Sequence, residues 1–103
     1  MVDIIRGTTP TIIYEFRTVD VASLAVVILT VKSGSVIKLQ KDLTDATAGE
    51  KSLTWDLTQE ETLMFDINER AKMMLNYRLA DGTRGASRET ELCFRQNHIE
   101  EVI

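Results

Sequence analysis

The run from Leu24 to Lys32 constrains the fold more than any other segment of the chain. Its residues alternate with the period of two that is typical of a β-strand. One row is apolar throughout and consists of Ala25, Val27, Leu29 and Val31. The opposite row begins with Leu24, Val26 and Ile28 and becomes polar at Thr30. Because both rows carry apolar side chains, we expect a strand that is central in its sheet or covered on its second face.

Shorter alternating segments predict further strands on both sides of this one. We expect them at 11–17, 36–41, 52–57 and 71–79, followed by a return arm that turns Leu92 and Phe94 inward. The expected inner rows are Ile12, Tyr14 and Phe16; Ile37 and Leu39; Leu53, Trp55 and Leu57; and Ala71, Met73, Leu75, Tyr77 and Leu79. The segment 42–51 has no period, so we expect a loop there.

Two turns connect neighbouring strands. Ser33-Gly34-Ser35 is a short turn in which the glycine can supply a positive φ, and Asp81-Gly82 has the sequence of a two-residue type I′ turn. A hairpin centred on Asp81-Gly82 places Lys72 opposite Glu91. The same register puts Arg88 on the inner face, which is unfavourable for a charge. We therefore expect either an open rim at Arg88 or a β-bulge at Gly85, and favour the bulge.

One short helix is expected near residues 58–65. Thr58 can accept a hydrogen bond from the backbone of Glu61, whose carboxylate can return to the backbone of Thr58, which is the reciprocal pattern of a capping box. Only one or two turns fit, and so short a helix needs packing for stability. We expect it to close one end of the β structure with Leu63 and either Met64 or Phe65.

These elements predict an all-β fold: an immunoglobulin-like antiparallel β-sandwich of about six to seven strands, or a partly open barrel, with one short helix. The length of 103 residues fits a single domain over 1–103. Within it, 1–10 is expected to be an irregular lead-in. The segment 96–103 is expected to be a short continuation or a tail whose apolar end docks on the domain or a neighbour.

Charge and composition exclude several classes of protein. The chain has 12 basic and 16 acidic residues, so it lacks the basic surplus that duplex nucleic acid requires. Its single cysteine cannot form an internal disulfide. The start from Met1 to Arg6 does not resemble a signal peptide, and the longest apolar stretch, Leu24 to Leu29, is far shorter than the roughly 20 residues of a membrane span. We expect a soluble, intracellular protein with no nucleic-acid or membrane partner.

No pattern of catalytic or metal-binding residues stands out. Cys93 and His98 are expected on opposite faces, which argues against a catalytic pair. Asp42, Asp45 and Glu50 share a loop but lack the spacing of a calcium site. The segment 84–88 holds two arginines that could attract an anion, yet it matches no phosphate-binding motif. We expect no enzyme activity, no metal and no cofactor.

The outer rows predict a contact surface instead. Ile13, Val26, Ile28 and Met74 are apolar residues on rows expected to face outward, and a patch of such residues is typical of protein–protein contact. Exposed strand edges could also accept a strand from a neighbour. An interaction or structural protein is therefore favoured over an enzyme.

Three segments resemble a known family: Ile5 to Thr11, Trp55 to Leu63, and Ala80 to Ser87. Their Arg-Gly-Thr-Thr-Pro opening, Thr-Gln-Glu helix start and Asp-Gly-Thr hairpin look like those of small tail-region proteins of phages and prophages in Gram-positive bacteria. They also resemble the N-terminal β-sandwich domain of phage baseplate upper proteins. The resemblance covers about Ile5 to Ile103 and contains no catalytic motif.

The resemblance implies a virion or assembly component that is made in the bacterial cytoplasm and can enter the particle. Its partners would be other tail or baseplate proteins or further copies of itself. Baseplate upper proteins continue into a long C-terminal part that carries or attaches receptor-binding modules, and this sequence lacks that part. A connector or accessory role is therefore expected rather than direct receptor binding. The alternative is a carbohydrate-binding module for host-surface glycan, which requires exposed aromatic rings, whereas Tyr14, Trp55 and Tyr77 fall on expected inner rows.

Overall fold

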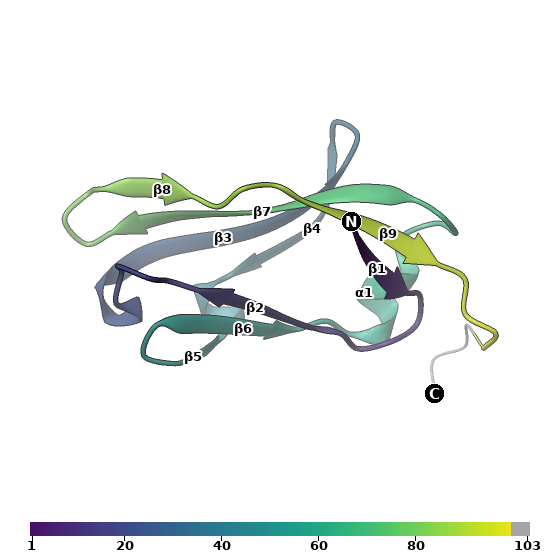
Figure 1. Cartoon of the computed structure of the whole chain (residues 1–103), viewed down its shortest axis with the longest axis horizontal. Coiled ribbons are helices and arrows are strands. Elements are labelled where there is room, and N and C mark those ends of the chain that lie inside the picture. The colour runs from purple at the N-terminus through teal and green to yellow at the C-terminus, as the bar shows by residue number, and fades with distance from the viewer. Residues whose placement is uncertain (100–103) are drawn as a thin grey trace.

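Two β-sheets pack face to face in the computed structural model, which describes residues 1–99 (Figure 1). The strands are β1 (Val2–Ile5), β2 (Thr11–Glu15), β3 (Leu24–Ser33), β4 (Val36–Asp42), β5 (Thr47–Ala48), β6 (Ser52–Asp56), β7 (Arg70–Leu79), β8 (Arg84–Ala86) and β9 (Thr90–Arg95). The helix α1 spans Gln59–Leu63, and single 3₁₀ turns lie at Val21–Ser23 and Leu43–Asp45. The prediction of an all-β fold with one short helix is confirmed.

The two sheets differ in size. Sheet A has six strands in the order β1-β9-β7-β3-β4, with β8 beside the far half of β7, and forms the upper layer in Figure 1. Sheet B has three strands in the order β2-β6-β5 and forms the lower layer. The strand β3 lies between β7 and β4, so its expected central position is confirmed.

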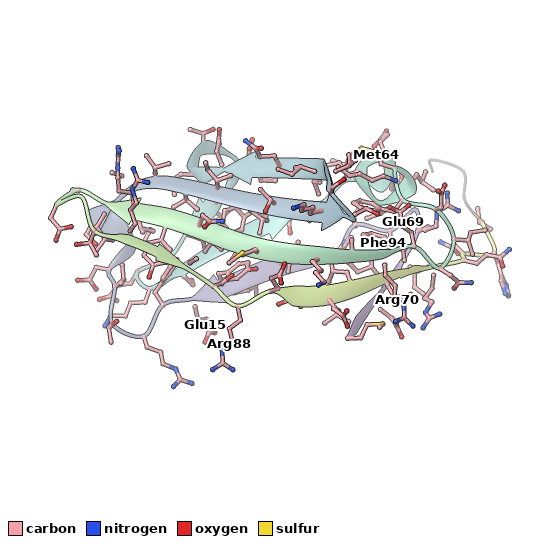
Figure 2. All side chains as sticks on the ribbon, turned by 90° about the horizontal axis from the view of Figure 1, so that it is seen from above. Glu15, Met64, Glu69, Arg70, Arg88 and Phe94 are labelled. Carbon is pink, nitrogen blue, oxygen red and sulfur yellow. The ribbon has the colours of Figure 1, made fainter. Side chains whose placement is uncertain are left out.

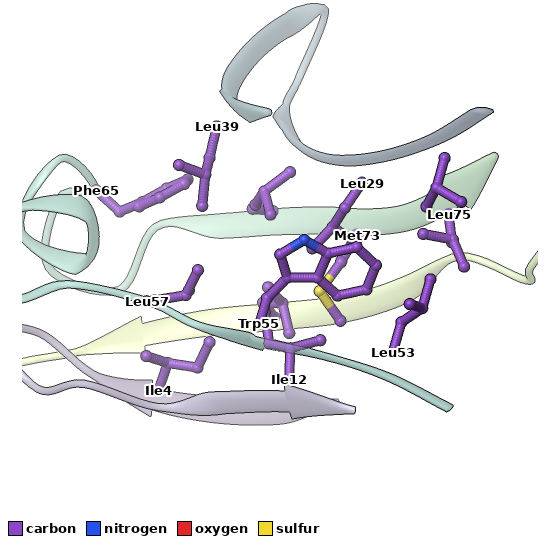
Figure 3. Close-up of a cluster of buried hydrophobic side chains, with 14 of the residues drawn as sticks. Ile4, Ile12, Leu29, Leu39, Leu53, Trp55, Leu57, Phe65, Met73 and Leu75 are labelled. Atoms are coloured by element: carbon purple, nitrogen blue, oxygen red, sulfur yellow. The ribbon is translucent and has the colours of Figure 1, made fainter. Parts of the chain in front are cut away.

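The core lies between the sheets and contains side chains from both of them (Figure 3). The inner row expected for residues 52–57 is buried: Leu53 and Trp55 of β6, and Leu57 just beyond it, are at most 2% exposed. Trp55 also donates its indole N–H to the carbonyl oxygen of Asp42 at 3.0 Å, which ties sheet B to the end of β4. Leu29, Val31 and Leu75 complete the opposite wall from sheet A, together with Val27, Ala71 and Met73.

The lead-in is not wholly irregular. It contains β1, which pairs in parallel with β9 and buries Ile4 against the core. This parallel pair departs from the expected antiparallel arrangement. Its two strands are the first and the last of the chain. Four residues carry too little alternation to identify such a strand, and no hairpin links it to its partner.

Irregular pairing at two bulges overturns two inner-row predictions. The β3–β7 register shifts between Leu24 and Val26, so Leu24 is buried and Ala25 is exposed, the reverse of the expectation. The β3–β4 register shifts as well, so Leu39 is buried but Ile37 faces solvent. A bulge inserts one residue into one strand and thereby exchanges the faces of the residues beyond it.

The tip of the last hairpin also differs from the prediction. The N–H of Gly82 donates to the carbonyl oxygen of Leu79, and the N–H of Leu79 donates to that of Thr83, so the loop has three residues, 80–82. Gly82 has φ 93°, but Asp81 is not among the positive-φ residues. This is a type I turn followed by a left-handed residue, not a type I′ turn.

Lys72 still lies opposite Glu91, as predicted. The reason is that a second irregularity compensates for the longer loop. Ser87 pairs with Leu75 and so continues the register of the β7–β8 pair. Thr90 pairs with Met73, so the register of the β7–β9 pair is shifted by one residue. The extra residue lies at 87–89, where Arg88 is exposed, rather than at Gly85. The predicted bulge is therefore present but at a different place, and Leu92 and Phe94 are buried as expected.

The helix α1 closes one end of the sandwich. The capping box between Thr58 and Glu61 is confirmed, with both reciprocal hydrogen bonds formed. Phe65, just beyond the helix, is 1% exposed and stacks on Phe94 with ring centroids 3.9 Å apart, whereas Met64 faces solvent. Phe65 is therefore the residue that closes this end.

The remaining expectations concern the middle loop and the tail. The segment 42–51 is a loop broken by a 3₁₀ turn and the two-residue strand β5. In the tail, the side-chain amide of Asn97 donates to the carbonyl oxygen of Arg6 at 3.0 Å. The apolar chain end that was expected to dock falls at 100–103, outside the described residues.

Candidate interaction surfaces

The residues considered for catalysis do not come together. Cys93 is buried in β9, and His98 is exposed beyond the end of that strand. Asp42 and Asp45 instead cap the 3₁₀ turn: Asp42 accepts hydrogen bonds from the backbone and hydroxyl of Thr44, which lower the pKa of its carboxyl group. Across residues 1–99, no group of three or more His, Cys, Asp and Glu side chains is placed to hold a metal ion.

The arginine-containing segment 84–88 does not form one anion site. Arg84 lies on β8 beside Arg78 of β7, whereas Arg88 protrudes from the bulge at the sheet margin (Figure 2). Between them, Ser87 is engaged with Leu75: its hydroxyl accepts a hydrogen bond from the Leu75 N–H at 2.9 Å. The two arginines therefore contribute to different parts of the surface.

The three aromatic residues expected on inner rows, Tyr14, Trp55 and Tyr77, pack in or against the core. Trp55 is 1% exposed, and Tyr14 meets it edge-on in the core at 6.2 Å. Tyr77 is half-buried and meets Phe16 edge-on at 5.5 Å. Burial raises the pKa of the Tyr14 hydroxyl, as expected for a phenol at the margin of a core.

The four residues of the predicted contact surface do not form one patch. Val26 (39% exposed), Ile28 and Met74 lie on the outer face of sheet A. Ile13 is 59% exposed but belongs to β2, on the outer face of sheet B. The sandwich therefore presents two separate apolar spots, one on each of its opposite outer faces.

The outer face of sheet A has an apolar centre, Ile28 and Met74 with Asn76 and Thr30 opposite them, between two pairs of like charges. Arg78 of β7 lies directly opposite Arg84 of β8. Six residues away along β7, Lys72 lies directly opposite Lys32 of β3. All four cations are exposed, and none makes an ion pair within the part of the chain that the structure describes. Figure 2 looks onto this face from above.

Like charges directly opposite one another destabilise a pair of strands. The Arg78–Arg84 pair therefore opposes folding of the free protein, whereas Lys72 has Glu91 of β9 directly opposite it on its other side. Beside the arginine pair is a shallow hollow of about 270 Å³, lined by Val26, Ile28, Asn76, Tyr77, Arg78, Arg84 and Gly85. This face can receive a partner with apolar side chains at its centre and carboxylates at its ends. Sequence reasoning identified its apolar part and the Lys72–Glu91 pair but missed the Lys32–Lys72 pair, because β3 and β7 are far apart in the chain.

The outer face of sheet B has the opposite charge pattern. Its strands contain no lysine or arginine, and Ile13 lies at the centre of β2. Glu15 lies two residues beyond Ile13, and Asp56 lies opposite Thr11, two residues before it. Asp56 is held in place because the Thr11 hydroxyl donates to its carboxylate at 2.7 Å. This face is thus an apolar centre between two acids.

A third surface feature, which sequence reasoning did not predict, is a cleft of about 520 Å³ between the edges of β1 and β2. Its floor includes Ile4, Ile12, Met73 and Leu92, and Val2 and Ile5 are exposed at its rim. The cleft exists because the small sheet B leaves the margin of the larger sheet A uncovered. Sequence reasoning predicted no strand at 2–5, so it gave no indication of a cleft beside that strand.

Comparison with known proteins does not identify a family. No protein-family model matches the chain, and no curated protein matches it. Over residues 1–99, no helix has the length and apolar character needed to cross a bilayer.

Proposed function

We propose that this chain is a non-enzymatic structural or assembly protein of the tail or baseplate region of a phage or prophage, acting through protein–protein contacts. The phage context comes from the resemblance of the three segments named above. The observation that carries the contact role is the outer face of sheet A. There Ile28 and Met74 lie between the Arg78–Arg84 and Lys32–Lys72 pairs, and Val26 lies directly opposite Arg78.

This arrangement supports a contact role because Arg78 lies opposite Val26 and Arg84 and has no acid across either strand, so that an external anion would offset this charge pair. An ordinary solvated sheet face gains nothing from placing like charges opposite each other. A partner that covers the apolar centre would exclude water, which strengthens the attraction between these cations and its carboxylates. Nothing in the aromatic residues favours the alternative of glycan binding, since the single tryptophan is buried in the core.

The test is to express the chain alone and together with the products of the genes that flank it, and to measure masses by size-exclusion chromatography with light scattering. We expect a self-assembled species, a complex with a tail protein, or both. Val26→Asp should reduce this assembly, because it places a charge in the apolar centre. Val36→Asp is the matched control, since Val36 is 59% exposed on the edge strand β4. A wild-type protein that is strictly monomeric and binds none of its neighbours would overturn the proposal.

A further inference from the structure

We infer that the partner of the basic face is a second copy of this chain, which docks its own sheet B face onto sheet A. This inference rests on the proposed structural function and names the occupant of the same face. In the contact, Ile13 of one copy lies on Val26, Ile28 and Met74 of the next. Glu15 and Asp56 of the first copy meet the two basic pairs of the second.

The match in charge order is the main argument. Along its strand direction sheet A presents the Arg78–Arg84 pair, an apolar centre and the Lys32–Lys72 pair, which has Glu91 beside it on β9. Sheet B presents acid, apolar centre and acid along its own strands. Lys72 and Arg78 are six residues apart on β7, which is about 20 Å at the rise of an extended strand. Thr11, which is paired with Asp56, and Glu15 are about 13 Å apart by the same measure. The long lysine and arginine side chains can bend inward to cover this difference.

The match in shape and chemistry is the second argument. Both surfaces are faces of sheets, and sheets pack face to face in aligned β-sandwiches. The acidic face carries Thr11, Ser52 and Thr54 around Ile13, and none of its three strands contains a lysine or arginine. Arg17 and Lys51 lie just beyond the strand ends on the side of Glu15. The contact also brings together Ile13 and the other three predicted surface residues, which lie on opposite sides of a single copy. In one copy each apolar spot is exposed to solvent, whereas between two copies the spots form one buried cluster.

The contact joins two different faces, so it is heterologous. Each copy that docks leaves one basic face and one acidic face free, and successive copies therefore form a ring or an open stack. This predicts a mass that rises with protein concentration and falls with salt, because the surrounding charges are exposed. An isologous dimer would instead stop at two copies.

The decisive experiment uses two charge-reversed variants of the full chain. The first is Arg78→Glu with Arg84→Glu, which removes a basic pair and leaves sheet B intact. The second is Glu15→Lys with Asp56→Lys, which removes the acids and leaves sheet A intact. Each variant alone should remain monomeric in sedimentation velocity at a concentration where wild type assembles. An equimolar mixture should form a one-to-one dimer, with an affinity at least about tenfold above that of either variant for itself.

Matched controls exclude trivial causes. Arg88→Glu reverses one charge at an exposed position in the bulge of residues 87–89, outside both faces, and should assemble like wild type. Thermal unfolding monitored by circular dichroism verifies that every variant is folded. Self-assembly of both variants, or a mixture that does not associate, would overturn the inference. A monomeric wild type that still binds a neighbouring tail protein would overturn the inference but leave the proposed function standing.

Discussion

The side-chain hydroxyl of Thr62 accepts a hydrogen bond from the backbone N–H of Gly7 at 2.9 Å. It thereby connects helix α1 to the turn that follows β1, across 55 positions of sequence. The same hydroxyl lies 3.0 Å from the carbonyl oxygen of Thr8, to which it donates. Thr62 is completely buried, so water cannot replace these bonds.

The first prediction concerns this connection. Thr62→Val keeps the shape of the side chain but leaves the Gly7 N–H without its acceptor, so it should lower the free energy of unfolding by about 1–3 kcal/mol. Thr62→Ser retains the hydroxyl and loses only a methyl group, which should cost about 1 kcal/mol or less. Urea unfolding followed by tryptophan fluorescence measures both. A valine variant as stable as the serine variant would show that the hydroxyl contributes nothing.

The second prediction concerns Gly85 and its cross-strand partner Tyr77. The Tyr77 ring lies over the Gly85 backbone, so a Cβ atom at position 85 would overlap with it. Gly85→Ala should therefore lower stability by about 1–3 kcal/mol, the usual cost of overpacking. In a Tyr77→Ala background the ring is absent, and Gly85→Ala should then cost little. The difference between the two backgrounds, measured by urea unfolding, is the coupling energy. Equal costs in both backgrounds would contradict the steric explanation.

The third prediction concerns acid stability and begins with Glu61. Burial alone would raise the pKa of its carboxyl group, but hydrogen bonds from Lys41 and the Thr58 backbone outweigh burial and lower that pKa. At Glu69, burial also acts to raise the pKa of the carboxyl group, but hydrogen bonds outweigh it and the pKa is lowered. That carboxylate accepts hydrogen bonds from the Asp66 N–H and from Lys38, the latter at 2.9 Å.

A pKa that is lower in the folded than in the unfolded protein has a definite sign. The stabilisation is complete above the unfolded-state value, about 4.3 for glutamate, and is lost as the pH falls through the folded-state value. We therefore expect the free energy of unfolding to fall from pH 5 towards acid, and to fall less steeply in Glu61→Gln and Glu69→Gln. Urea unfolding across this range tests the expectation. Slopes in both variants equal to that of wild type would contradict it.

Local alternation predicted the inner faces well where strands run without interruption. Leu53 and Trp55 are buried because β6 has no bulge, so the period of two holds along its whole length and continues to Leu57 just beyond it. Ala25 and Ile37 were placed wrongly because each lies next to a register shift. Such a shift depends on how two strands fit each other, so it cannot be predicted from the sequence of one strand alone.

The candidate surfaces show the same boundary between local and long-range information. Outward rows identified Ile13 and Val26 as exposed apolar residues, which is correct. Whether two outward residues share a face depends on which strands pair, and β2 belongs to a different sheet from β3. The charge pattern around each spot was hidden for the same reason.

The sequence by itself determined the all-β class, the capping box of α1 and the alternation of most strands, because these depend on residues a few positions apart. Only the tertiary structure decided that β1 joins β9, that Lys72 lies opposite Lys32, and that the four apolar surface residues lie on opposite faces. These features depend on pairings between segments far apart in the chain. Such pairings are selected by the packing of the whole core, since any one strand could satisfy its own backbone hydrogen bonds with several partners.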